Sequence, residues 1–459
     1  MGGTREPRRW WVLAAMSGAL AMTFIDETGV GVALATIRRE LHTSPTGVHW
    51  VMNAYMLTLA ALVAASGRLA DVFGRRRVFA VGLVVFGAGS LLSATAPGLP
   101  LLVAWRAVQG VGAALLIPTA LTIVAGSFPP AERGRAVGTY IGAASVFYVV
   151  GPLVTGALTQ EVGWRAVFWV NVPLACAVGV VAALAVAPDP PVRRRERLDV
   201  VGLLTDAAGL GALVVALMEG PALGWASPAV PALGAGAVLL LAVFVLAERR
   251  RTAPLFDLTL LRRGPLACAV GMVFLVYVVY LGLIVFVPLF LQHEAGLRPL
   301  AAGLALTLAL GPIIAVAPVN GRIVDRSGAR RPALVAALTA LVSFAWLALA
   351  APAHSFPLLL PALLLYGVSI PAVYNTAVTV AQNLAPDAQR GQVSGLLGSA
   401  AQAGAAIGVA VIGAVVVAVS GSADYTTAGF RAGFGLCAVL SLVLVPLALA
   451  LPRRPPAGG

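Results

Sequence analysis

The segment GRLADVFGRR at residues 67–76 returns in altered form as GRIVDRSGAR at residues 321–330. Both copies keep a glycine, an aspartate and a second glycine at the same spacing, and the offset, 321 minus 67, is 254 residues. A further match at a similar offset pairs Gly151 with Gly408. An internal repeat of this length predicts that the chain contains two copies of one structural unit.

The composition excludes a soluble enzyme, a disordered chain and a secreted disulfide scaffold. Of 459 residues, 60% are apolar and only 11% are charged, and the mean hydropathy is +0.94. A soluble protein of this length still needs a polar exterior, which these residues cannot supply. The three cysteines, Cys176, Cys268 and Cys437, stand alone without metal-ligand or redox spacing. The chain is therefore expected to be a polytopic membrane protein.

A helix that crosses a bilayer needs about 20 mostly apolar residues. This length divides the chain into fourteen candidate spans, which is an even number and so leaves both termini on one side. The expected spans are residues 10–37, 48–66, 78–95, 99–126, 136–158, 164–187, 200–219, 229–247, 265–291, 300–319, 332–351, 356–380, 393–420 and 428–451.

The repeat and the spans together predict three parts. Residues 1–190 form an N-terminal six-helix bundle, residues 191–261 form a two-helix insert with its linkers, and residues 262–459 form a C-terminal six-helix bundle. Parallel halves related by an axis along the membrane normal are an architecture of transporters. The predicted fold class is all-α, with two six-helix bundles and a two-helix central insert.

The arginines predict the orientation. All 31 basic residues are arginine, against 18 acidic residues, and the net charge is +13. If the N-terminus is cytoplasmic, 25 arginines lie in cytoplasmic segments, five lie in outer segments and Arg106 lies within a span. This asymmetry predicts that both termini are cytoplasmic and that the protein crosses the cell membrane many times. The same distribution argues against nucleic-acid binding.

The repeated loop is predicted to gate the protein from the cytoplasmic side. Its glycines permit tight turns, and its aspartate can pair with arginines or face a helix N-terminus. A plain positive-inside loop is the alternative. The gating residues are Gly67, Asp71, Gly74, Arg75 and Arg76 in the first copy, and Gly321, Asp325 and Gly328 in the second.

Asp26 and Glu27 lie midway along the first span, and Arg106 lies inside the fourth. Ionisable residues at that depth are costly and are functional by default. Burial favours the neutral form of a carboxyl group, which can then exchange a proton or a cationic substrate. Adjacent helical residues point about 100° apart, so the two acids need not share one site. A static ion pair with Arg106 is the alternative.

Three segments resemble one family of transporters. Residues 67–77 resemble the signature loop of the major facilitator superfamily. The sequence FIDETGVGVAL at residues 24–34 and WRAVFWVNVP at residues 164–173 are similar to motifs of its fourteen-helix drug:proton antiporters. This resemblance implies the major facilitator fold and proton-coupled drug export. It matches Asp26 to the acid of the first-helix motif, whereas Glu27 stands at a position that the motif leaves variable.

Two more spans carry the resemblance. WRAVQGVG at residues 105–112 is similar to the fourth-helix motif, whose arginine is implicated in proton transfer, and Arg106 occupies that position. The fifth span resembles the antiporter motif of exporting members, except at Phe147 and Thr155. The matching residues are Gly138, Gly151, Pro152 and Gly156.

Further polar residues in the spans are candidates for lining a central cavity: Asn53, Tyr277, Tyr280, Asn375 and Gln402. Each is equally expected to form a hydrogen bond between helices. Asp206 in the insert is a candidate second proton site, although a partner in solvent or in lipid headgroups is the favoured interpretation.

The predicted function is proton-coupled export of amphiphilic or cationic small molecules by alternating access. The alternative is an uptake symporter or an exporter of lipids or metabolites. A membrane-embedded enzyme is disfavoured because the four histidines are scattered. We expect no metal, no cofactor and no ATP site, since the sequence has no phosphate-binding glycine loop with lysine. The expected partners are a small-molecule substrate, protons and the lipid bilayer, and the chain is expected to be monomeric.

Overall fold

The computed structural model describes residues 6–189, 200–250, 258–262, 264–385, 389–421 and 424–452. Within these ranges the chain forms helices, turns and loops, and no strand occurs. Fourteen of the described helices are long and apolar enough to cross a membrane, which is the number expected from the sequence. The all-α fold class is therefore confirmed.

The first six spans fold as one bundle, and the sixth span is divided near Val170. The helices are α1 (Glu6–Glu40), α2 (Pro45–Phe73), α3 (Arg75–Ala94), α4 (Leu99–Ser127), α5 (Pro130–Glu161), α6 (Arg165–Trp169) and α7 (Asn171–Ala185). The insert contributes α8 (Val200–Leu223) and α9 (Ala229–Arg250).

The last six spans form the second bundle after a 3₁₀ turn, η1 (Leu258–Arg262). The span expected at residues 300–319 is divided at Gly311 and Pro312, because proline has no N–H to donate to the preceding turn. The helices are α10 (Gly264–His293), α11 (Pro299–Leu310), α12 (Ile313–Ser327), α13 (Arg330–Ala350), the 3₁₀ turn η2 (Ala351–Ala353), α14 (Phe356–Leu384), α15 (Arg390–Ser420) and α16 (Thr427–Leu449).

The repeated segment was expected to be a loop, but most of it is helical, because α2 continues to Phe73 and α12 continues to Ser327. The turn itself is confined to one glycine in each bundle. Gly74 separates α2 from α3 with φ at 97°, and Gly328 separates α12 from α13 with φ at 76°. A residue with a side chain rarely adopts a positive φ, so glycine is required at both turns. The second glycine of the repeat is thus explained by backbone geometry.

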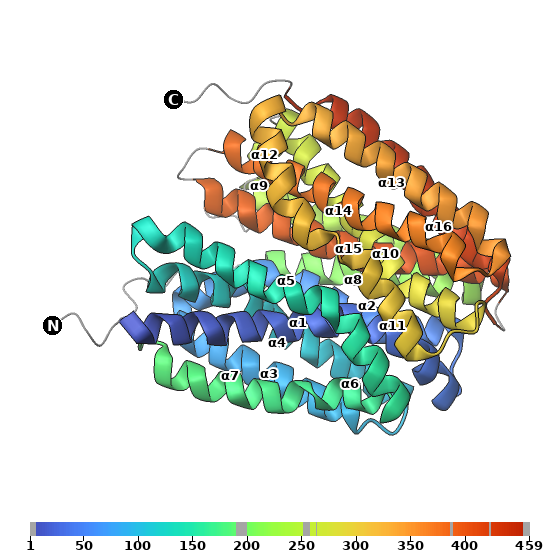
Figure 1. Ribbon diagram of the computed structural model, residues 1–459, viewed down its shortest axis with the longest axis horizontal. Coiled ribbons are helices and arrows are strands. Elements are labelled where there is room, and N and C mark those ends of the chain that lie inside the picture. The colour runs from blue at the N-terminus through green and yellow to red at the C-terminus, as the bar shows by residue number, and fades with distance from the viewer. Residues whose placement is uncertain are drawn as a thin grey trace.

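The two bundles lie side by side with both termini at the same end of the molecule (Figure 1). They contact each other mainly through α5 with α11 and through α2 with α15, and α8 packs against both α2 and α15. Contacts between α5 and α12, which lie nearer the termini, are few. The bundles therefore meet at the end opposite the termini and stand apart at the other end (Figure 1).

Candidate functional site

Asp26 of α1 is the centre of a buried polar cluster in the N-terminal bundle. Its side chain is fully buried and pairs with Arg106 of α4, with Arg106 Nη1 at 2.6 Å from Asp26 Oδ2. Gln109 Nε2 donates to Asp26 Oδ1 at 2.9 Å, and Asn171 Nδ2 donates to the same oxygen at 3.4 Å. Asp26 therefore forms an ion pair with Arg106, which was the alternative interpretation of the sequence.

Arg106 is held on several sides. Its Nε donates to the Val51 carbonyl at 2.9 Å, and its Nη1 donates to Gln109 Oε1 at 2.7 Å. The guanidinium carbon lies 4.3 Å from the ring centre of Tyr55 and 5.6 Å from that of Phe168. Breaking a buried pair by removing one partner is costly, because the other charge is left without compensation. Asp26 and Arg106 therefore depend on each other.

Sequence reasoning missed three members of this cluster: Ser90, Gln109 and Asn171. Ser90 Oγ donates to the Phe168 carbonyl at 2.9 Å and accepts from Asn171 Nδ2 at 3.1 Å. The sequence could have indicated two of them, because Gln109 and Asn171 are polar residues inside segments that resemble family motifs. We call Asp26, Ser90, Arg106, Gln109 and Asn171 the Asp26 cluster.

Glu27 follows Asp26 in the chain but has different surroundings. The residue is 6% exposed, and no residue that the structure describes forms a hydrogen bond or an ion pair with its side chain. It interacts electrostatically with Asp26 and with Tyr277 and Tyr280 of α10. An ionised carboxylate without partners is costly to bury, so this position favours binding of a proton or a cation.

Tyrosine rings from both bundles pack around Tyr277 and Tyr280, the two rings that interact electrostatically with Glu27. The ring of Tyr148 in α5 stacks on Tyr280 at 5.8 Å, and Tyr280 stacks on Tyr366 in α14 at 6.0 Å. Tyr277 contacts both Tyr280 and Tyr374, with ring centres 5.7 Å apart in each case. We call these five residues the tyrosine group. The faces of aromatic rings attract cations, so the group and Glu27 can act together on a positively charged ligand.

The two candidate asparagines lie on α2 and α14. Asn53 of α2 is buried, and its Nδ2 lies 2.6 Å from Met218 Sδ in α8, so it contacts the insert. Asn375 of α14 is half-buried, and no hydrogen bond of its side chain occurs within the described part of the chain. Asp206 of α8 is also half-buried and interacts electrostatically with Glu248 of α9.

The first gating loop is fastened within its own bundle by Asp189, which sequence reasoning did not single out. Asp189 Oδ1 accepts from the Arg76 backbone N–H at 2.9 Å, and Oδ2 accepts from that of Arg77 at 3.2 Å. These bonds cap the N-terminus of α3. Arg76 Nη2 also donates to the Ala183 carbonyl at 2.8 Å. A Cβ built on Gly74 would collide with Asp189 Oδ2.

Other members of the gating loops are less well defined. A Cβ built on Gly67 or Gly321 would meet no atom within 4 Å. Arg75 is exposed. The side chains of Asp71 and Asp325 lie outside what the structure describes, although both residues fall in the last turns of α2 and α12. The gating role of these two aspartates therefore stays a prediction.

The glycines of α5 divide into two sets. A Cβ built on Gly151 would lie 2.6 Å from Thr28 Oγ1 in α1, and one built on Gly156 would lie 2.6 Å from the Pro299 carbonyl in α11. The Pro152 carbonyl is similarly close to Gly303 of α11. Gly138, nearer the termini, has no atom within 4 Å of such a Cβ. In this conformation only the half of α5 away from the termini uses its glycines for packing.

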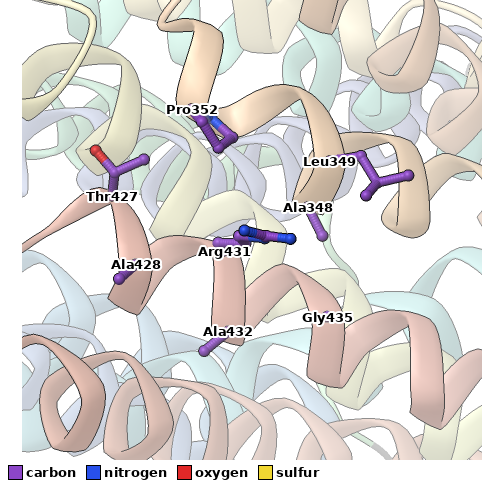
Figure 2. Close-up of a pocket in the computed structure, with 8 residues that line it drawn as sticks. All are labelled: Ala348, Leu349, Pro352, Thr427, Ala428, Arg431, Ala432 and Gly435. Atoms are coloured by element: carbon purple, nitrogen blue, oxygen red, sulfur yellow. The ribbon is translucent and has the colours of Figure 1, made fainter.

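A surface pocket of about 520 Å³ lies apart from the Asp26 cluster (Figure 2). It is bordered by the end of α13, by η2 and by the first turns of α16, and Arg431 extends into it from α16 (Figure 2). Its other lining residues are mostly small or apolar, including Leu349, Ala432 and Gly435. The pocket belongs to the C-terminal bundle alone, and it shares no lining residue with the Asp26 cluster or the tyrosine group.

A fourteen-helix protein with two similar bundles and a buried acid–arginine pair has the organisation of a secondary transporter. Residues 16–409 match the family model of the Major Facilitator Superfamily. The chain therefore belongs to the Major Facilitator Superfamily, whose members carry small-molecule substrates.

Named relatives and solved structures agree with this family. The chain is 34% identical over 407 residues to the multidrug resistance protein Stp of Mycobacterium tuberculosis (strain CDC 1551 / Oshkosh), covering 88% of this chain and 75% of that protein. It is 35% identical over 418 residues to the puromycin resistance protein pur8 of Streptomyces alboniger, covering 89% and 82%. The crystal structure of a D-xylose-proton symporter superposes with a TM-score of 0.69 at 15% identity, covering 97% and 98%, and supports the fold.

Proposed function

We propose that the protein is a proton-coupled exporter of amphiphilic or cationic small molecules, with both termini in the cytoplasm. The observation that carries the proposal is Glu27, a buried carboxyl group without a hydrogen-bonding partner in the described structure, beside the tyrosine group. The names of the drug-resistance relatives support export, and the 25 arginines counted on one side support the orientation. The end opposite the termini is accordingly the outer end.

The proposed cycle exchanges a proton for a cation at Glu27. In the conformation that opens toward the termini, a cationic substrate binds Glu27 and the tyrosine rings, and the proton of Glu27 leaves to the cytoplasm. After the outer end opens, a proton from outside neutralises Glu27 and releases the substrate. One proton enters for each cation exported, so the proton gradient drives the export.

The Asp26 cluster has a different part in this proposal. Asp26 and Arg106 join α1 to α4, and Gln109 and Asn171 hold the carboxylate in place. Since Glu27 is the next residue of α1, the position of its side chain depends on this ion pair. We propose that Asp26 and Arg106 position Glu27 and set its electrostatic surroundings. A direct role of Asp26 as proton carrier would require Arg106 to move away during the cycle.

The test uses proteoliposomes that carry a pH-sensitive dye and receive a cationic dye such as ethidium. We expect Glu27→Gln to lower substrate-driven proton flux on the order of tenfold or more, because the variant cannot release a proton to a cation. Glu161→Gln is the matched control, since Glu161 is an exposed glutamate at the end of α5. Proton flux in the same direction as the substrate would instead favour an uptake symporter, and unchanged flux in Glu27→Gln would overturn the proposed site.

A further inference from the structure

The surface pocket of the C-terminal bundle combines one positive charge with apolar walls. Its volume of about 520 Å³ lies in the range of small-ligand sites. Its polar lining residues are Thr427 and Arg431 of α16, and no aspartate or glutamate of the described chain lines it (Figure 2). The other lining residues are Ala348, Leu349, Pro352, Ala428, Ala432 and Gly435. The pocket therefore offers a cation and a surface for hydrocarbon in one place.

The charge of Arg431 has no partner among the described residues. None of them forms a hydrogen bond or an ion pair with its guanidinium group, which extends into the pocket (Figure 2). The hydroxyl of Thr427, in contrast, already donates to Glu294 Oε2 and lies 3.1 Å from His354 Nε2. The N–H donors of Arg431 are therefore the groups that remain for a ligand in this pocket.

The position of Arg431 in its helix also favours an anion. α16 begins at Thr427, so Arg431 stands in its second turn. Helical side chains lean toward the N-terminus of their helix, which brings the guanidinium group toward the first turn. The N-terminal end of a helix has a positive dipole, and no acidic residue stands in the first turn of α16 to balance it. Two positive contributions therefore meet at this end of α16.

The pocket lies where two membrane spans end. α13 ends and α16 begins at the end of the molecule opposite the termini, and the two helices pack against each other. On α16, the exposed Val439 and Leu442 continue the face of Gly435 away from the pocket. On α13, the exposed Val342 lies on the same face as Leu349. A ligand here would have its polar part at the level of the lipid headgroups and apolar surface beneath it.

We propose that this pocket binds an anionic phospholipid from the leaflet at the end opposite the termini. The lipid phosphate pairs with Arg431, because a guanidinium group can give two parallel hydrogen bonds to phosphate oxygens. The acyl chains lie along the apolar faces of α13 and α16. An anionic headgroup fits better than a zwitterionic one, since the pocket has no carboxylate among the described residues for an ammonium group. Lipid binding here is separate from the Glu27 site and does not require proton coupling.

Gly435 provides room for this lipid. It lies one turn beyond Arg431 on the same face of α16, and a Cβ built on it would meet no atom within 4 Å. A leucine at this position would extend into the pocket without displacing a neighbour at its Cβ, and leucine is a better helix former than glycine. Gly435→Leu therefore removes the space of the pocket while it keeps the charge of Arg431.

The experiment uses native mass spectrometry of the full-length protein in detergent to measure the affinity for added phosphatidylglycerol. Phosphatidylcholine is the zwitterionic comparison. We expect the first phosphatidylglycerol to bind about tenfold more tightly than the first phosphatidylcholine, as for a hydrogen bond between charged groups. Arg431→Gln should remove that preference, because the variant keeps the apolar walls but not the charge. Gly435→Leu should weaken the binding of phosphatidylglycerol by a similar factor.

Arg298→Gln is the matched control, because Arg298 is exposed at the same end of the molecule and does not line the pocket. It should keep the preference of the unchanged protein, and an equal loss in this control would reveal a general charge effect and overturn the site. A preference that survives both Arg431→Gln and Gly435→Leu would also overturn it, even if one variant is unstable. Displacement of phosphatidylglycerol by excess glycerol phosphate would assign the pocket to a soluble phosphate ester and contradict the lipid.

Discussion

At the residue scale, Asp26 and Glu27 are neighbours with opposite surroundings. Asp26 accepts bonds from an arginine, a glutamine and an asparagine, whereas Glu27 faces tyrosine rings of the other bundle. Their different directions follow from the 100° turn between consecutive helical residues. The sequence could not decide which acid meets Arg106, because that choice depends on how α1 is rotated against α4.

The Asp26–Arg106 pair can be tested by a double-mutant cycle on stability. Asp26→Asn alone leaves Arg106 as a buried charge without compensation and should destabilise the protein by about 3–5 kcal/mol. Adding Arg106→Gln removes that charge, so the double variant should unfold at a higher temperature than either single variant. Thermal unfolding in detergent micelles gives the three values. Additive losses would contradict the close pair.

The other members of the Asp26 cluster were hidden from sequence reasoning for a related reason. Ser90, Gln109 and Asn171 come from three different helices, and a single polar residue in an apolar span does not name its partner. Gln109→Leu should cost about 1–3 kcal/mol, because the variant withdraws a donor from Asp26 and an acceptor from Arg106. Gln402, another glutamine within a span, is the comparison, because its Oε1 has no hydrogen-bond partner among the residues that the structure describes.

At the element scale, the glycine turns explain most of what the repeat could predict. The repeat predicted a turn between the second and third spans, but it ended the second span at residue 66, whereas α2 continues to Phe73 and α3 begins at Arg75. It did not reveal the cap on α3, because Asp189 lies 113 residues beyond Arg76 along the chain. Long-range contacts of this kind leave no local pattern.

The structure predicts different effects for the two glycines of the first repeat, because only Gly74 lies in the turn. Gly74→Ala should destabilise the protein by about 1–2 kcal/mol, because the residue has a φ of 97° and its Cβ would displace Asp189. Gly67→Ala should be neutral or stabilising, since Gly67 is helical and its Cβ would meet open space. Chemical unfolding in mild detergent compares the two. Equal losses would contradict the role of the Asp189 cap.

At the scale of the whole molecule, the fold class and the number of spans could be predicted, but the conformation could not. Hydrophobic spans of about 20 residues and a repeat give fourteen helices in two bundles. A transporter sequence must specify more than one arrangement of its bundles, so its pattern does not select one. The structure has α5 against α11 at the end opposite the termini and few contacts between α5 and α12.

Bulky residues on α5 should therefore shift the conformation in opposite directions. Gly156→Val places methyl groups against the Pro299 carbonyl and should push open the end opposite the termini. This opening should lengthen the distance between spin labels on Thr95→Cys and Ala353→Cys, two exposed positions, after the three native cysteines are replaced by alanine. Gly138→Val meets open space here and should leave the short distance in place, while it hinders closure at the end near the termini. The same spin-label measurement reads both variants. A longer distance in Gly138→Val would contradict this arrangement.

The insert makes the two flanks of the molecule unequal. On one flank, α8 lies across α2 and α15, and Trp50 donates to Glu219 at 2.8 Å to fasten it there. On the other flank, α5 presents exposed apolar residues such as Val154, and α11 presents Leu304 and Leu308. A hydrophobic molecule dissolved in the bilayer would thus reach the seam between the bundles from the α5 and α11 flank, whereas α8 obstructs the opposite approach.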